Sequence, residues 1–319
     1  MTIDRNQQAI SVTGLRKSYG EHVVLDGIDL NVQRGSVFSL LGANGAGKTT
    51  TVKILSTLIN ASAGTISVAG HDVATEPDAV RAAIGVTGQF SAVDNLLNGR
   101  ENLMMMADLN HLARADGRRR TAELLEQFDL VEAAGKPAST YSGGMRRRLD
   151  LAMTLVGSPR VIFLDEPTTG LDPRSRREMW QIVRGLVAGG VTIFLTTQYL
   201  DEADELADRI AVLDHGKVVA EGSPEELKRR IPGGHVRLRF ADPRGLDSAR
   251  QVLGQTTDDT DALALRVPSD GSLRSLKTLL DRLDDQAIEV DELSVHTPDL
   301  DDVFLAFTGD PAKEKVTTR

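Results

Sequence analysis

Hydrophobic and polar residues alternate along the first part of the chain. Residues 11–19 and 23–32 show this period of two, which predicts two half-exposed strands of an antiparallel sheet. Residues 64–73 predict a further edge strand and turn, and residues 86–88 predict a short central strand.

Three other segments are apolar without interruption, at residues 36–41, 161–164 and 191–196. Continuous apolar runs are typical of parallel strands that are covered on both faces. A glycine-rich loop follows the first run and leads into a predicted helix over residues 48–58. Residues 210–213 and 217–220 predict a hairpin.

Helical spacing of apolar residues predicts helices over residues 100–112 and 117–128, which we interpret as a helical insertion. Residues 143–156 place Leu149, Ala152 and Val156 on one helical face, and Pro159 ends that helix. A further helix is predicted from residue 201 to 206.

The pattern restarts after residues 231–234, which contain Pro232, Gly233 and Gly234. Strands are then predicted at 235–240, 262–267 and 288–295, and helices at 246–253, 273–283 and 300–307. We therefore expect a first domain over residues 1–230, with a helical part at about 90–158, and a small α+β domain over 235–309. Residues 310–319 are polar and predicted to be disordered.

The amino-acid composition limits the classes of protein to which this chain can belong. Hydrophobic residues make up 40% of the 319 residues and charged residues 26%, which is typical of a globular protein. No apolar run approaches the roughly 20 residues that a membrane-spanning helix needs, and no signal peptide is visible. The absence of cysteine excludes disulfides and thiolate metal sites, and the net charge of -9 argues against nucleic-acid binding.

The strongest chemical signal is the sequence GANGAGKT, which follows a predicted strand and precedes a predicted helix. Its glycines let the backbone wrap closely around phosphate oxygens, Lys48 adds a positive charge, and Thr49 offers a hydroxyl to Mg²⁺. The residues predicted to bind ATP here are Gly42, Asn44, Gly45, Ala46, Gly47, Lys48, Thr49 and Thr50.

Two acids, Asp165 and Glu166, follow the apolar run at 161–164. Open α/β sheets bind ligands at the carboxyl ends of their strands. Asp165 suits the coordination shell of Mg²⁺, and Glu166 suits activation of the attacking water. Because Pro167 follows, the pair could instead begin a helix.

Ser142, Gly143 and Gly144 open the helix at 143–156. Ser142 is a plausible N-cap, and two glycines at a helix start expose backbone amides that can bind an anion. Taken alone, the segment is also compatible with an ordinary capped helix.

Along the chain, the glycine-rich loop is followed by Gln89, then by Ser142 to Gly144, and then by Asp165 and Glu166. This set, in this order, resembles the ATPase domain of the ABC transporter family over about residues 10 to 230. The resemblance implies an α/β P-loop NTPase fold with a mixed-sheet core, an antiparallel β subdomain and a helical subdomain. It also implies a homodimer, or pairing with a similar chain, in which Ser142 and Gly144 contact the γ-phosphate of ATP bound to the other copy. By the same resemblance Tyr19 stacks on adenine, Gln89 links Mg²⁺ and water to a membrane partner, and Asp172 lies in a loop at the dimer interface.

Simpler interpretations exist for some of these residues. Tyr19 could only pack on its sheet, and Gln89 could be an ordinary surface residue. The arginine runs at 118–120 and 146–148 predict solvated helix faces, and Met104 to Met106 predict packing within the helical insertion.

One position departs from the family pattern. Where the family usually has histidine, this chain has Gln198, in the sequence TTQY. An amide can donate a hydrogen bond to a γ-phosphate but cannot carry a proton as histidine can. We predict that Gln198 senses the γ-phosphate by hydrogen bonding alone.

The C-terminal segment PDLDDVFL, residues 298–305, resembles the C-terminal module of drug-export ATPases of the daunorubicin-resistance type. That resemblance implies export of a hydrophobic compound through a separate permease, at the cytoplasmic face of a bacterial membrane. A generic dimer-stabilising module is the alternative for this segment. An importer ATPase, an ABC ATPase acting on ribosomes or DNA, and a nucleotide-sensing regulator are the alternatives for the whole chain.

Overall fold

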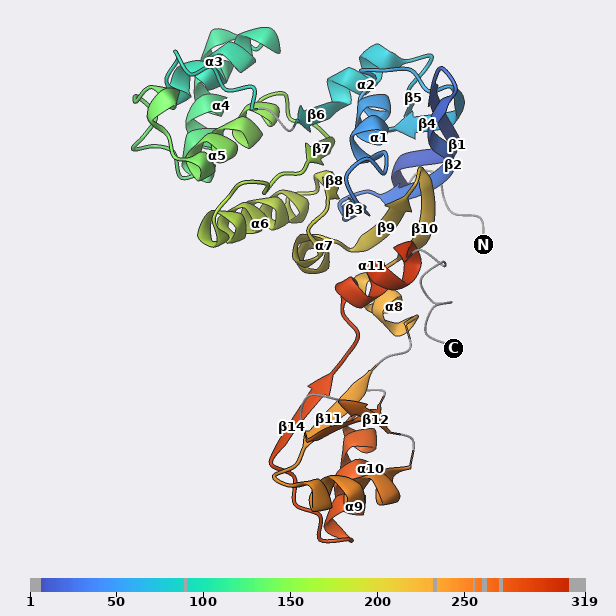
Figure 1. Cartoon of the computed structure of the whole chain (residues 1–319). Coiled ribbons are helices and arrows are strands. Elements are labelled where there is room, and N and C mark those ends of the chain that lie inside the picture. The colour runs from blue at the N-terminus through green and yellow to red at the C-terminus, as the bar shows by residue number, and fades with distance from the viewer. Residues whose placement is uncertain are drawn as a thin grey trace. The chain divides into compact units, whose positions relative to one another are not determined.

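The computed structural model describes residues 7–88, 91–231, 234–254, 256–259, 263–269 and 272–309 (Figure 1). The chain forms two compact units, which divide between Pro224 and Glu225. The domain boundary predicted at 231–234 lies a few residues after this division. The disorder predicted for residues 310–319 concerns residues outside the described part of the chain.

A six-stranded mixed sheet forms the centre of the first unit. In spatial order its strands are β10 (Lys217–Gly222), β9 (Arg209–Asp214), β3 (Val37–Leu41), β8 (Thr192–Thr197), β7 (Val161–Asp165) and β6 (Ile84–Thr87). All neighbours pair in parallel except β10, which forms the predicted hairpin with β9. Every residue of β3, β7 and β8 is buried, which confirms the interpretation of the three apolar runs.

Strand β6 was predicted to be central, and this is wrong. It lies at the edge of the sheet and pairs only with β7 among the described strands. Its residues alternate between half-buried and buried positions, so one face of this edge strand is more covered than the other.

A second, antiparallel sheet contains β2 (His22–Gln33), β1 (Gln8–Tyr19), β4 (Ala63–Val68) and β5 (His71–Asp72) in that order. The predicted pairing of the first two strands is confirmed. The edge strand predicted at 64–73 is in fact two strands, and only the short β5 is at the edge. This sheet, helix α1 (Lys48–Leu55) and one face of the central sheet share a core in which Phe38 and Phe194 stack 5.5 Å apart.

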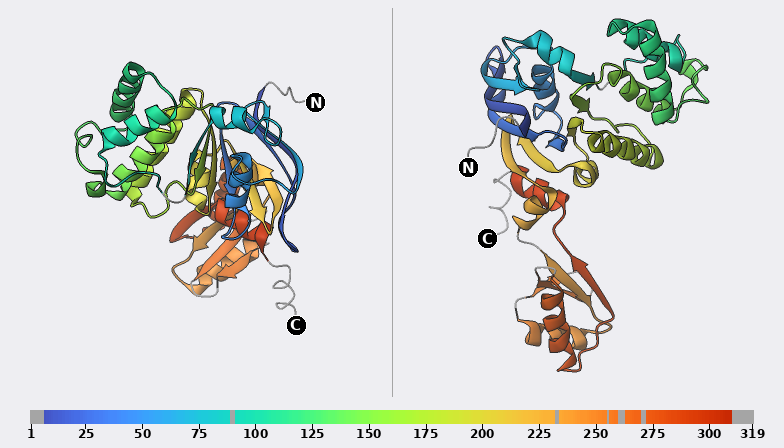
Figure 2. Two further views of the ribbon diagram at one scale, coloured as in Figure 1. Left: turned by 90° about the horizontal axis from the view of Figure 1, so that it is seen from above. Right: turned by 180° about the vertical axis from the view of Figure 1, so that it is seen from behind.

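Three helices form the predicted helical insertion: α3 (Gly99–Leu109), α4 (Arg114–Gln127) and α5 (Gly143–Thr154) (Figures 1 and 2). Their apolar faces share a core with the other face of the central sheet, built around Leu103, Leu124, Phe128 and Leu149. Among its described residues this unit also contains α2 (Pro77–Ala83), η2 (Ala138–Thr140), α6 (Pro173–Ala188) and α7 (Leu200–Leu206). Helix α6 was not predicted, although Asp172 and Pro173 are a typical helix start.

The second unit contains an antiparallel sheet of β12 (Thr257–Asp259), β13 (Ala264–Pro268), β11 (His235–Arg239) and β14 (Glu292–His296). Helices α9 (Pro243–Leu253) and α10 (Leu273–Asp284) cover one face of it (Figure 1). Helix α8 (Pro224–Arg229) precedes the sheet and α11 (Leu300–Thr308) follows it. Strand β14 begins later than predicted. Ile288 and Val290 pack on the core of this unit, and pairing with β11 starts at Glu292. None of the helices described in either unit has the length and apolar content to span a bilayer.

Candidate active site

The register of the central sheet brings the predicted motifs to one edge. Leu41, the last residue of β3, pairs with Thr197, and Asp165 at the end of β7 pairs with Thr196 of β8. The glycine-rich loop, the acidic pair and Gln198 therefore follow three adjacent parallel strands. Chain reversals at the carboxyl ends of parallel strands are where α/β sheets bind ligands.

Two glycines of the loop are required by close packing. A Cβ atom on Gly42 would lie 2.5 Å from the carbonyl oxygen of Leu213. Gly47 has φ of 113°, and a Cβ there would lie 2.6 Å from Leu25. A side chain at either position would push the loop away from β9 or β2, so these glycines keep the backbone in the tight turn that opens onto the start of α1.

Lys48 places a positive charge beside the glycine-rich loop. Its side chain is 5% exposed, and Nζ donates hydrogen bonds to the carbonyl oxygens of Gly42 at 2.8 Å and Ala43 at 3.1 Å. Nζ also lies 3.6 Å from Oε1 of Glu166. Burial lowers the pKa of Lys48, although the neighbouring carboxylates of Glu166 and Asp165 act in the opposite direction. An anion bound in the loop would add a further charge partner for this buried ammonium.

The side chains of Thr49 and Asp165 fit a magnesium ion. Thr49 Oγ1 lies 3.3 Å from Asp165 Oδ1, and the hydroxyl of Thr196 also donates to Oδ1. Hydroxyl and carboxylate oxygens are ligands that Mg²⁺ accepts, with phosphate and water completing its octahedron. Within the described residues there is no group of three or more histidine, aspartate or glutamate side chains that could hold a metal ion. A magnesium ion at Thr49 and Asp165 would therefore also need oxygen ligands from the nucleotide and water.

Glu166 is held in an unusual backbone conformation beside Lys48. Its φ of 51° lies in the left-handed region, which a residue with a side chain rarely adopts. Its backbone N–H donates to the carbonyl oxygen of Thr196 at 3.1 Å, and its Oε2 accepts from Thr169 Oγ1 at 3.3 Å. A residue in this region persists only where its surroundings hold it there.

The Glu166 carboxylate borders a cavity of about 480 Å³. The other residues that line it are Asn44, Ser91, Gly143, Arg146, Arg147, Thr169, Gly170, Leu171 and Gln198. The structure thus brings the loop, Glu166 and Gln198 to one space, which the start of α5 also borders. The catalytic and binding roles of these residues remain predictions.

Ser142, Gly144 and Asp172 lie at the starts of α5 and α6. Ser142 is the N-cap of α5, where its side chain accepts from the backbone N–H of Met145 at 3.2 Å. A Cβ on Gly144 would lie 2.6 Å from Oγ of Ser175, so the two helix starts approach closely. Asp172 caps α6, and its hydrogen bonds from Ser175 lower its pKa. In a single chain the Asp172 carboxylate therefore already accepts hydrogen bonds from the first turn of α6.

Three predicted site residues remain, which are Tyr19, Thr50 and Gln89. Tyr19, at the end of β1, is 52% exposed, and Nζ of Lys17 lies 4.8 Å from the centre of its ring. An exposed ring is compatible with stacking on a base and does not match the alternative of packing on its sheet. Thr50 is half-buried in the first turn of α1. Gln89 lies outside the described residues.

The burial of Arg147 and Glu202 could not be predicted from the sequence. Residues 146–148 were predicted to form a solvated face, but none of them is exposed, and the Arg147 side chain is only 11% exposed. Glu202 is fully buried, accepts from Thr168 Oγ1 at 2.8 Å, and has its pKa raised by burial. An arginine in a basic run and an acid in a polar helix carry no local signal of burial, because both contacts are long-range.

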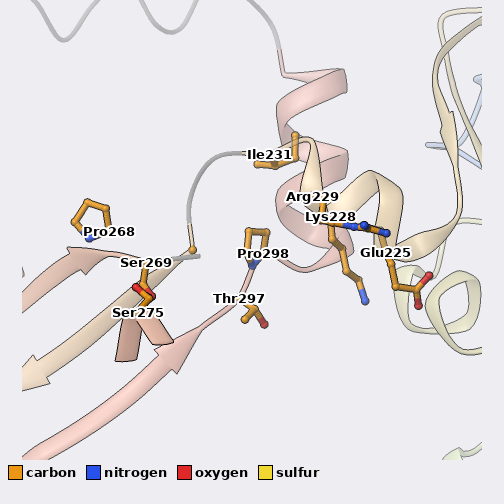
Figure 3. Close-up of a pocket in the computed structure, with 10 residues that line it drawn as sticks. Glu225, Lys228, Arg229, Ile231, Pro268, Ser269, Ser275, Thr297 and Pro298 are labelled. Atoms are coloured by element: carbon orange, nitrogen blue, oxygen red, sulfur yellow. The ribbon is translucent and has the colours of Figure 1, made fainter. Parts of the chain in front are cut away.

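A larger cavity, of about 750 Å³, lies within the second unit (Figure 3). Helix α8 contributes Lys228 and Arg229 to its lining, and Ser269 and Ser275 lie together on another side. It contains none of the residues predicted to bind nucleotide. The cavity that borders Glu166 therefore remains the candidate for the chemistry.

Comparisons with known proteins agree with this arrangement. The pattern of the ABC transporter family matches residues 25–169, and that of the C-terminal domain of DrrA1-3-like ATP-binding proteins matches residues 222–308. The daunorubicin resistance ATP-binding protein DrrA3 of Streptomyces coeruleorubidus is 50% identical over 96% of this chain and 98% of its own length. The daunorubicin/doxorubicin resistance ATP-binding protein DrrA of Streptomyces peucetius is 49% identical over 97% of this chain and 95% of its own.

A solved ATP-binding subunit of an ABC transporter has the same fold as the first unit. It superposes with a TM-score of 0.63 and 28% identity, covering 70% of this chain and 92% of its own length. The family pairs such subunits with a membrane permease. The chain therefore belongs to the ABC transporter ATP-binding proteins, which bind and hydrolyse ATP for transport, and within them to the group of the daunorubicin-resistance ATP-binding proteins.

Proposed function

We propose that this chain drives export of a hydrophobic drug-like compound through a separate permease, from the cytoplasmic face of a bacterial membrane. The observation that carries this proposal is the extent of the similarity to daunorubicin-resistance proteins. It covers nearly the whole chain and includes the C-terminal unit as well as the ATPase. An importer, or an ATPase acting on ribosomes or DNA, would not require this C-terminal similarity.

In the proposed mechanism two copies close around ATP. Lys48 and the amides at the start of α1 neutralise the phosphates of a nucleotide bound to one copy. Ser142 and Gly144 of the other copy contact its γ-phosphate, and Tyr19 stacks on the adenine. Such a shared site makes closure depend on ATP, and loss of the γ-phosphate lets the copies separate.

Hydrolysis in this proposal depends on Glu166. Its carboxylate lies 3.6 Å from Nζ of Lys48, close to where the outer phosphates would bind, and it would orient water for in-line attack. Mg²⁺, held by Thr49 and Asp165 and, as the family resemblance implies, by Gln89, would offset the charge that develops on the phosphate oxygens. We expect no nucleic-acid partner, because the net charge is -9.

The proposal is tested with the chain and its permease together in inverted membrane vesicles. We expect ATP-dependent accumulation of daunorubicin or doxorubicin, and none with the Glu166→Gln chain, because closure and reopening drive transport. A complex that hydrolyses ATP but takes up neither these compounds nor any other in a panel of hydrophobic drugs would contradict the drug-export assignment. Dependence of transport on a solute-binding protein would instead identify an importer.

Gln198 gives a separate prediction. If its amide senses the γ-phosphate, Gln198→Ala lowers hydrolysis by about tenfold through loss of one hydrogen bond to a charged group. Gln198→His should retain activity, because histidine can donate the same bond. ATPase assays of both variants test this, and an unchanged rate for Gln198→Ala would show that the side chain has no such role.

A further inference from the structure

The guanidinium of Arg147 lies next to the backbone on both sides of Glu166. Its Nε donates to the carbonyl oxygen of Pro167 at 2.8 Å, and Nη2 lies 3.4 Å from that of Asp165. A third contact joins Nη1 to the carbonyl oxygen of Gly88 at 3.0 Å. One planar group therefore joins the segment after β6 to the residues before and after Glu166.

Glu166 needs such support. Its left-handed φ of 51° is costly for a residue with a side chain. The carbonyl of Asp165 belongs to the peptide plane directly before Glu166. That of Pro167 lies one peptide further on, beyond a proline ring that fixes φ, so the two contacts restrain the backbone before and after Glu166. The direction of the Glu166 carboxylate depends on that backbone.

The position of Arg147 is itself supported from the same helix. Nη1 lies 3.2 Å from Oδ2 of Asp150, whose Oδ1 accepts from the backbone N–H of Ala92 at 2.9 Å. Both side chains are nearly covered, at 11% and 3% exposed. Burial lowers the pKa of Arg147 and raises that of Asp150, so the site disfavours both charges unless they are paired.

We propose that Arg147 is a positioning residue for ATP hydrolysis, which holds Glu166 in its working orientation through the flanking carbonyls. Arg147 lies one turn into α5, the helix that begins at Ser142 and Gly143. It therefore joins the start of that helix to the Glu166 of the same chain. This inference rests on the proposed role of Glu166 in activating water.

Arginine suits this task and lysine does not. The guanidinium presents five donors in a rigid fork, whereas the ammonium of lysine is a single compact charge on a flexible stem. Arg147→Lys keeps the charge beside Asp150 but cannot reach the carbonyls of Pro167, Asp165 and Gly88 together.

Arg148→Lys is the matched control. Arg148 is on the same helix, is similarly covered at 16% exposed, and also donates to a backbone carbonyl, that of Phe128 at 3.2 Å. Its acidic partner is Asp129, at 3.3 Å, in the helical insertion rather than beside Glu166. A general effect of losing a half-buried arginine on α5 would appear in both variants.

The experiment measures kcat and KM for ATP, together with Tm, in the full chain. We expect Arg147→Lys to lower kcat by about 10- to 100-fold, since a small misplacement of a catalytic group has effects of this size. KM should change little, and Tm should fall about as much as in Arg148→Lys, whose kcat should stay near that of the parent. Asp150→Asn should lower kcat in the same direction and by less.

Equal kcat for Arg147→Lys and Arg148→Lys, or a change confined to KM, would overturn the inference. If Arg147→Lys does not fold, Asp150→Asn decides in its place, and a parental kcat for that variant overturns it. Glu166→Gln, assayed in parallel, separates the two proposals. If Glu166→Gln hydrolyses ATP at the parental rate, both proposals are wrong. If Glu166→Gln is inactive and Arg147→Lys keeps the parental kcat, only the proposed role of Arg147 is wrong.

Discussion

Replacing Glu166 by glutamine should leave ATP bound and lower its hydrolysis by about 10²- to 10⁴-fold, the usual contribution of a positioned base. Glutamine has nearly the same shape and can still accept from Thr169 Oγ1, which lies 3.3 Å from the carboxylate of the parent chain. It cannot accept a proton from water. The closed, ATP-bound form should therefore accumulate.

Single-turnover hydrolysis and equilibrium ATP binding on the same preparation separate the two effects. Glu178→Gln is the control, because Glu178 is an acid on α6 whose partner is Arg174, 3.1 Å away. We expect that variant to behave as the parent chain. Normal turnover by Glu166→Gln would mean that another group activates the water.

Lys48→Ala should lower the affinity for ATP by about 100-fold, the value of a strong hydrogen bond to a charged group. The ammonium that lies 3.6 Å from Glu166 would be lost, so the carboxylates of Glu166 and Asp165 would face the incoming phosphates without this positive charge. The effect should appear in binding itself, which distinguishes it from that of Glu166→Gln.

Titration calorimetry with ATP and Mg²⁺ measures this directly. Lys53→Ala is the matched control, since Lys53 is on the same helix α1 and its side chain is exposed. Similar dissociation constants for Lys48→Ala and the parent chain would contradict the assigned phosphate contact.

Much of the central sheet could be predicted because its signals are local. The apolar runs that became β3, β7 and β8 end directly before Gly42, Glu166 and Gln198. Their parallel arrangement then places these ends at one edge of the sheet, so a pattern in sequence becomes a site in space.

Features that depend on long-range contacts could not be predicted in this way. The position of β6 at the sheet edge depends on which strands pair, and not on its own residues. Arg147 looked like part of a solvated basic face, yet its contacts are with Gly88, Pro167 and Asp165, which are distant in sequence. Only the folded chain shows that these carbonyls converge on one side chain.

The structure of the Glu166→Gln chain with bound ATP and Mg²⁺ tests the central claim of a shared nucleotide most directly. We expect two copies, with the γ-phosphate of each ATP in contact with Lys48 of one copy and with Ser142 and Gly144 of the other. Nucleotide bound at Lys48 with Ser142 of every copy far from any phosphate would contradict it.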